Sequence, residues 1–186
     1  MLATKLISST HFDLWDMIRQ WNRRRQFKDA VSTGYDPFSP TSRFVKSKEV
    51  PKTPAQQKAE EESTQLRLEI SNRIMERNLP AAAELFLKLM AHDSEQILPR
   101  QQLLDIANQL AGQNRHAEAV QAYEQFLKHY KNYEYSEQVE LMLGIIYTRY
   151  LHQPDMAIKH LKEAEQKLTD PNQLKMCRDE IARLQK

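Results

Sequence analysis

Glycine and cysteine are scarce in this sequence, and long hydrophobic runs are missing from it. Only three of its 186 residues are glycines, which almost excludes glycine-rich phosphate loops and glycine-turned β-hairpins, because both need several residues at positive φ. The one cysteine, Cys177, excludes an internal disulfide framework and is typical of a reducing compartment. No run of about 18 apolar residues occurs, so the sequence predicts no membrane-spanning helix.

Recognisable catalytic and metal-binding motifs are also missing. The sequence contains no His-Glu-x-x-His, Gly-x-Ser-x-Gly, Cys-x-x-Cys or Gly-x-Gly-x-x-Gly pattern. The nearest approaches to a pair of metal ligands are His116 with Glu118 and His152 with Asp155, and neither pair has a third candidate ligand close by in the sequence. We therefore predict no enzyme, no catalytic residue, no metal site and no cofactor, and interpret these histidines as surface or turn residues.

Charge is distributed unevenly along the chain, although the formal net charge is only +2. Residues 1–50 carry nine Lys or Arg against five Asp or Glu, whereas residues 51–186 carry eighteen against twenty. Apolar residues three and four apart predict one helix over residues 12–31. A basic amphipathic arm, residues 1–33, therefore precedes a near-neutral body. The aromatic and basic residues expected to face a membrane or another anionic surface are Trp15, Arg19, Trp21, Arg23, Arg24, Arg25 and Lys28.

Three interpretations of this arm stay open. Tryptophan at the headgroup boundary, with arginine reaching anionic lipid, is typical of a helix that lies in a membrane interface. Alternatively, the tryptophans pack on the rest of the chain and the arginines are solvated. Attraction of the same cluster to nucleic-acid phosphate is the interpretation that we favour least. We expect a cytoplasmic protein, which becomes peripheral to the inner membrane if the arm binds lipid.

A stretch rich in proline and serine, residues 34–54, is predicted to be a linker, because proline interrupts regular helix. The remainder, residues 55–186, shows no strand signal and is predicted to be a helical repeat domain of three hairpins and a cap. Helices of this length joined by short turns indicate antiparallel helical hairpins. Turn signals divide the domain into helices at about 55–77, 80–92, 99–113, 115–130, 136–151, 154–168 and 171–185.

An internal repeat relates the three predicted hairpins. The second helix of each carries an alanine, at Ala83, Ala119 and Ala157, and these positions are 36 and 38 residues apart. A small residue there lets two helices cross closely, and large residues four and seven places later fill the same face. Gly144, on a first helix, leaves room for a neighbouring helix in the same way. Since no hairpin can bury its apolar stripe alone, three hairpins are expected to share one core.

The stretch from about residue 65 to residue 171 resembles the tetratricopeptide repeat family, whose unit of about 34 residues follows the pattern W-x2-L-G-x2-Y…A-x3-F…P. The third hairpin follows the pattern in Leu143-Gly144-x-x-Tyr147 and in the later Ala157-x-x-x-Leu161, and the first hairpin departs from it most. The resemblance implies an all-α fold, a right-handed array of antiparallel hairpins, with the last helix as a C-terminal cap.

The last predicted helix is amphipathic, as a solvent-facing cap requires. Its apolar face carries Leu174, Cys177, Ile181 and Leu184, and charged residues that include Glu180 are expected on its solvent side. Because Cys177 falls on the apolar face, we interpret it as a small buried hydrophobic residue rather than a reactive thiol.

By the family's geometry, the first helices of the second and third hairpins would line a concave surface. Several of their residues there are apolar, where purely structural positions would be polar, and this suits an extended or helical peptide. Alternatively, another helix of the same chain, such as the basic arm, covers them. Leu104 and Leu141 also stand where a clamp for chaperone C-termini would need charge or amide, which argues against that ligand. The predicted partner-binding residues are Gln101, Leu104, Asp105, Asn108, Gln138, Leu141, Met142, Ile145 and Arg149.

The predicted function is therefore a non-catalytic protein–protein interaction module that binds a peptide or protein segment. A second, fainter resemblance suggests an alternative: Trp21-Asn-Arg-Arg-Arg-Gln-Phe27 and Gly34-Tyr-Asp-Pro-Phe38 are similar to the juxtamembrane tail of bacterial rhomboid-type membrane proteins that carry a tetratricopeptide module. It implies a soluble cytoplasmic tail or adaptor of a membrane protein, localised by the basic arm. The catalytic residues of those proteins lie in membrane helices that do not occur in these 186 residues, so no activity is carried over.

Overall fold

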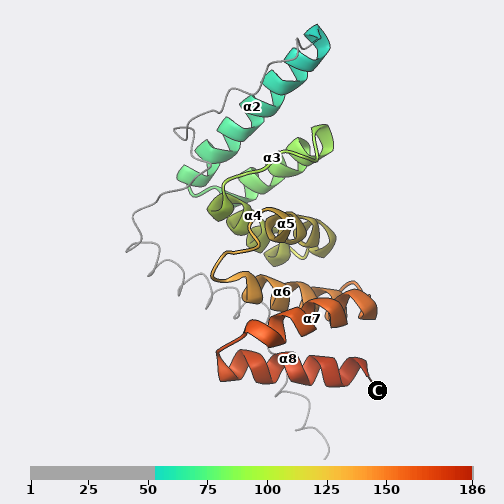
Figure 1. The fold of residues 1–186 in the computed structure, drawn as a ribbon. Coiled ribbons are helices and arrows are strands. Elements are labelled where there is room, and N and C mark those ends of the chain that lie inside the picture. Colours follow the sequence, from blue (N-terminus) through green and yellow to red (C-terminus); the bar gives the residue numbers. More distant parts are fainter. Residues whose placement is uncertain (1–52, 186) are drawn as a thin grey trace, which may run out of the picture. The chain divides into compact units, whose positions relative to one another are not determined.

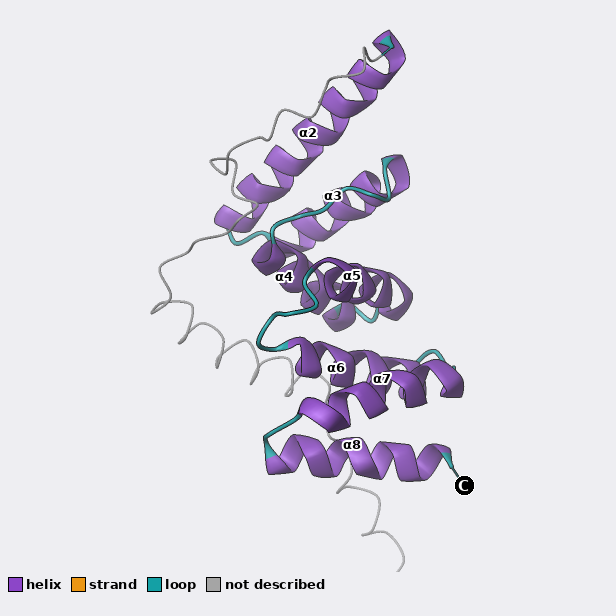
Figure 2. Ribbon diagram, in the orientation of Figure 1, coloured by secondary structure: helices purple, strands orange, loops and turns teal. Residues whose placement is uncertain are grey.

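The computed structural model describes residues 53–185, and this range is helical apart from short connections. No strand occurs within it, which confirms the predicted all-α class (Figure 2). The basic arm, residues 1–33, and almost all of the predicted linker lie outside the described residues.

The helices occur in the order that the turn signals predict, and their ends differ from the predicted ones by at most two residues. Figure 1 shows them following one another along the described part of the chain. In chain order they are α2 (Pro54–Met75), α3 (Leu79–His92), α4 (Arg100–Gly112), α5 (His116–His129), α6 (Ser136–Arg149), α7 (Pro154–Lys167) and α8 (Pro171–Leu184).

Local sequence explains where several of these helices begin. Thr53 and Gln56 form a reciprocal capping box at the start of α2, in which each side chain accepts from the other residue's backbone amide. Asn78 caps α3, and the Asp170 carboxylate accepts from two backbone amides in the first turn of α8. Proline occupies one of the first two positions of α2, α3, α7 and α8, where its missing N–H costs no helical hydrogen bond.

One turn geometry recurs after the first helix of each hairpin. Arg77, Asn114 and His152 all have positive φ, of 58°, 61° and 52°, and they are 37 and 38 residues apart. After Arg77 and after Asn114, the amide of the following residue donates to the carbonyl five residues before it, a closure typical of helix C-termini. The turn at His152 closes in a similar way but is one residue longer. The turns therefore recur at almost the period of the alanines, and the residue of α3 that is equivalent to Ala119 and Ala157 is Ala82, one place before the predicted Ala83.

Helices pack as hairpins, α2 with α3, α4 with α5 and α6 with α7, and each hairpin also contacts the helix that follows it. The repeated alanines Ala83, Ala119 and Ala157 are completely buried, as their proposed place at helix crossings requires. A Cβ added at Gly144 would lie 2.5 Å from Cγ of Leu161. This distance confirms that glycine at this position lets α6 approach α7 closely.

Candidate functional site

The predicted partner-binding residues lie on α4 and α6, the first helices of the second and third hairpins. Four residues of this set are apolar, and each is exposed by 2% or less: Leu104, Leu141, Met142 and Ile145. These side chains are therefore covered in this structure. Helix α6 is buried along most of its length, because apolar side chains from Val139 to Tyr147 occupy several of its sides.

The polar members of the predicted set bond mainly to neighbouring residues of the fold. Asn108 is 3% exposed, and its Oδ1 accepts a hydrogen bond of 2.5 Å from the hydroxyl of Tyr123 on α5. The half-buried Gln101 donates to the Asp105 carboxylate one turn later, at 3.2 and 3.3 Å. Gln138 is also half-buried, and its Oε1 has no hydrogen-bond partner. Asn108 thus joins α4 to α5, whereas Gln101, Asp105 and Gln138 remain partly accessible.

Arg149, predicted to face a partner, pairs with Glu180 of the last helix. The Nε atom of Arg149 lies 3.1 Å from Oε1 of Glu180, and a second guanidinium nitrogen contacts the same oxygen. Arg183 donates to this oxygen as well, at 3.3 Å. Glu180 is only 2% exposed, so the expectation that it belongs to the solvent side of the cap is wrong. Two guanidinium groups compensate its burial, as a buried carboxylate requires.

A buried polar cluster at α5, α6 and α7 has no counterpart in the sequence analysis. His160 is 6% exposed and its Nδ1 lies 2.6 Å from a carboxylate oxygen of Glu140. The Tyr147 hydroxyl donates to Glu124 at 2.6 Å, and its ring stacks on that of His160 with 5.6 Å between centroids. Burial raises the pKa of Tyr147, and the hydrogen bond to Glu124 raises that pKa further. The sequence contains one sign of this cluster. His160 comes three residues after Ala157, so helical spacing places it on the same, buried side of α7.

Two further histidines and the cysteine can be placed from the described part of the chain. His152 is exposed in the turn after α6, as expected, whereas His116 stacks on Tyr150 with 3.8 Å between centroids, and burial lowers the pKa of its imidazole. Cys177 is fully buried, which confirms its interpretation as a core residue, and its Sγ donates to the carbonyl of Leu161 at 3.0 Å. Burial raises the pKa of this thiol to about 11, so it stays protonated and unreactive near neutral pH.

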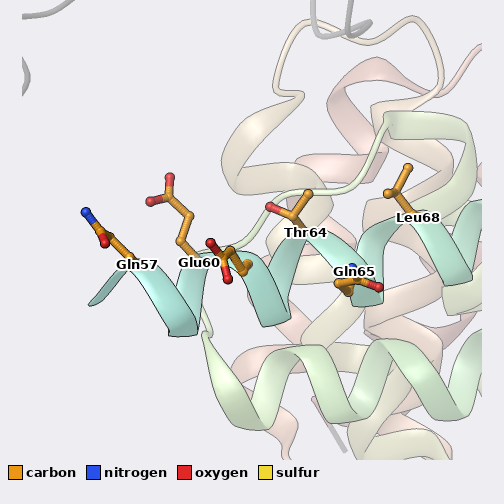
Figure 3. A pocket seen from close by; sticks show the side chains of 6 residues that line it. Gln57, Glu60, Thr64, Gln65 and Leu68 are labelled. Carbon is orange, nitrogen blue, oxygen red and sulfur yellow. The ribbon is translucent and has the colours of Figure 1, made fainter. Parts of the chain in front are cut away.

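A shallow hollow lies along the first half of α2 (Figure 3). The described residues that line it all belong to that one helix, and most of them are polar. Leu68 at its edge is 61% exposed and Met75, further along α2, is 75% exposed.

Two kinds of site are absent from residues 53–185. No three His, Cys, Asp or Glu side chains there gather closely enough to hold a metal ion. Within the same range, every helix is too short or too polar to cross a membrane. The residues expected to face a membrane, from Trp15 to Lys28, lie outside the described range.

Comparison with known proteins gives no relative for this chain: no family model, no curated protein and no solved structure matches it.

Proposed function

We propose that this chain is a non-catalytic interaction module of the tetratricopeptide type, which binds a peptide or protein segment on the face formed by α4 and α6. Three features support the tetratricopeptide assignment: the paired helices, an alanine buried near the start of the second helix of each hairpin, and the recurring turn at Arg77, Asn114 and His152. A right-handed array with α8 as its cap is the arrangement that this assignment implies.

One observation carries the proposed binding face, namely that α6 has buried apolar residues on two opposite sides. Between Val139 and Tyr147 only Glu140 is not buried. At 100° per residue, Leu141 and Ile145 lie on the side of α6 opposite Val139 and Leu143. Such a second apolar side is typical of a seat for an apolar peptide anchor.

Because Leu141 and Ile145 are already buried, binding at this face requires their present cover to move aside. The energy that a partner gains by burying its own apolar anchors is then reduced by the cost of displacing that cover. We therefore expect moderate affinity, and we expect the half-buried polar residues Gln101, Asp105 and Gln138 to contribute to the choice of partner.

A peptide selection with the full chain tests this proposal. Random peptides are selected on the immobilised protein, and their affinity is then measured by fluorescence anisotropy. The variant Asp105→Lys reverses a charge at the proposed face and should weaken the selected peptides by about tenfold, or ~1.4 kcal/mol. Asp179→Lys, an equal charge reversal at an exposed position of α8, serves as the control. Equal affinity for both variants would place the peptide site elsewhere.

We also propose an alternative role, as a soluble cytoplasmic tail or adaptor held at a membrane by the basic arm, because tryptophan with arginine favours an anionic membrane interface. Liposome flotation of the full chain distinguishes the two roles. Flotation on anionic but not neutral lipid, weakened by salt and lost after Arg23→Glu and Arg24→Glu, would favour the membrane role. Failure to float on anionic lipid would exclude it.

A further inference from the structure

A cleft of about 550 Å³ opens between α5, the start of α6 and α7. Its lining residues come from the second helices of two successive hairpins and from the first two turns of α6, and none belongs to the predicted partner-binding set. The cleft is therefore a separate feature from the face formed by α4 and α6.

Exposed lysines surround this cleft on two sides. Lys128 and Lys131 come from the end of α5 and the turn after it, and Lys159 and Lys167 come from α7. In the described part of the chain, Lys131, Lys159 and Lys167 form no ion pair. Lys128 lies 3.5 Å from the exposed Glu95, a kind of surface pair that is worth little. All four ammonium groups can therefore turn toward a bound anion at small cost.

Three carboxylates also line the cleft, and two of them already have partners. Glu140 accepts from the imidazole of His160, and Glu124 accepts from the hydroxyl of Tyr147. The third, Glu163, lies one turn from both Lys159 and Lys167 on α7 and is exposed. Hydrogen bonds do not remove the charge of Glu124 or Glu140, so an incoming anion meets four mobile ammonium groups against three carboxylates, and the lysines outnumber the carboxylates by one.

His160 supplies the buried polar group of this cleft. Its Nδ1 is held by Glu140, whereas its Nε2 has no hydrogen-bond partner, and the nearest carboxylate oxygen, from Glu124, is 4.0 Å away. The unused nitrogen is a donor when protonated and an acceptor when not. A phosphate monoester suits both states, because its oxygens accept hydrogen bonds and its singly protonated form also donates one.

We propose that this cleft binds a phosphate group, with the lysines of α5, of the turn after it and of α7 around its oxygens and His160 beneath it. A phosphate near neutral pH carries between one and a half and two negative charges on three oxygens. It can therefore contact ammonium groups from both helices at once, which a carboxylate with its single charge does less well.

Titration of the full chain with inorganic phosphate tests the proposal, followed through the imidazole resonances of His160 by NMR at fixed pH and ionic strength. Phosphate should shift these resonances saturably, and chloride should not. Acetate should bind at least about tenfold more weakly than phosphate. An unsaturable shift with phosphate, or equal affinity for acetate, would overturn the assignment.

Variants separate a built site from general attraction to positive charge. Lys159→Ala and Lys167→Ala should each weaken phosphate binding several-fold, whereas Lys162→Ala should not, because Lys162 is an exposed lysine of the same helix outside the cleft. An equal loss in all three variants would show unspecific attraction and overturn the proposal. His160→Asn keeps a donor for Glu140 while removing Nε2, and it should weaken binding without loss of thermal stability.

The same titration identifies the source of the phosphate group. A short peptide, Ala-phosphoserine-Ala, presents the group as a modified protein would, and inorganic phosphate presents it free. Tighter binding of the peptide would assign the cleft to phosphorylated protein segments, and equal binding would assign it to free phosphate. Either result is independent of peptide binding at the face formed by α4 and α6.

Discussion

The buried carboxylate of Glu180 depends mainly on one side chain, Arg149, for a compensating positive charge. Replacing the guanidinium in Arg149→Met leaves the 2% exposed carboxylate of Glu180 with only the mostly exposed Arg183 as a cationic partner. We expect a loss of about 3–5 kcal/mol in the free energy of unfolding, since removing one partner strands the other. Urea unfolding followed by circular dichroism measures this loss.

The double variant Arg149→Met/Glu180→Leu serves as the control for this prediction. It removes both charges and should recover most of the stability, because apolar pairs often replace buried ion pairs without loss. A loss in the single variant no larger than that of an exposed ion pair, about 0–1 kcal/mol, would contradict the buried role of Glu180.

Cys177 gives a second prediction at the residue scale. Burial raises its pKa from 9.0 to about 11, so the folded protein holds the thiol protonated where an unfolded chain begins to ionise. The contribution of the protonated thiol to the free energy of unfolding is therefore present in full below pH 9, and it is lost as the pH rises toward 11. At pH 8, alkylation by iodoacetamide should therefore be slow and should accelerate with urea in step with unfolding. Rapid alkylation without urea would show that the thiol is accessible.

At the scale of helices, the hairpin of α4 and α5 contains a small buried residue, Ala119, whose size can be tested. Ala119 is completely buried, so Ala119→Leu should overpack the hairpin and lower the free energy of unfolding by about 1–3 kcal/mol. The matched control is Gln121→Leu, which adds a leucine at an exposed position of the same helix. Thermal unfolding of both variants checks the prediction, and a wild-type melting temperature for Ala119→Leu would contradict the repeat register.

Helix positions could be predicted from the sequence because their causes are local. Proline and capping residues such as Asn78, Pro80 and Asp170 fix the starts of helices within one turn. These capping signals act over a few residues, so no knowledge of distant contacts was needed to place the helices. The close approach at Gly144 was predicted separately, from its small size, and its distance to Leu161 confirms it.

Much of the site could not be predicted, because it depends on residues far apart in the chain. Glu180 lies three residues after Cys177 and four before Leu184, at the edge of the apolar face, and only its charge suggested a solvent-facing place; the approach of Arg149, 31 residues earlier, compensates that charge. His160 and Glu140 are 20 residues apart and belong to different helices. The burial of Leu141 likewise depends on tertiary cover, which an amphipathic pattern on one helix does not reveal.

At the scale of the whole molecule, the contacts within residues 53–185 suggest that the helices do not depend on the basic arm. Each described helix packs against its neighbours in the chain. Deletion of residues 1–50 should therefore leave the far-UV helix signal per residue unchanged or higher, with a cooperative urea transition. Circular dichroism of the full chain and of the shortened one makes the comparison. A gradual transition in the shortened chain would show that the arm contributes to the core.

The recurring turn has a consequence for how long such a protein can be. Because the backbone closes in the same way after Arg77 and after Asn114, the segment 78–114 begins and ends at equivalent joints. A duplicate of this segment, inserted after Asn114, would meet the same geometry at both of its ends. Gain or loss of a whole segment of this kind therefore requires no new turn geometry. The number of hairpins can change by duplication in a single genetic event.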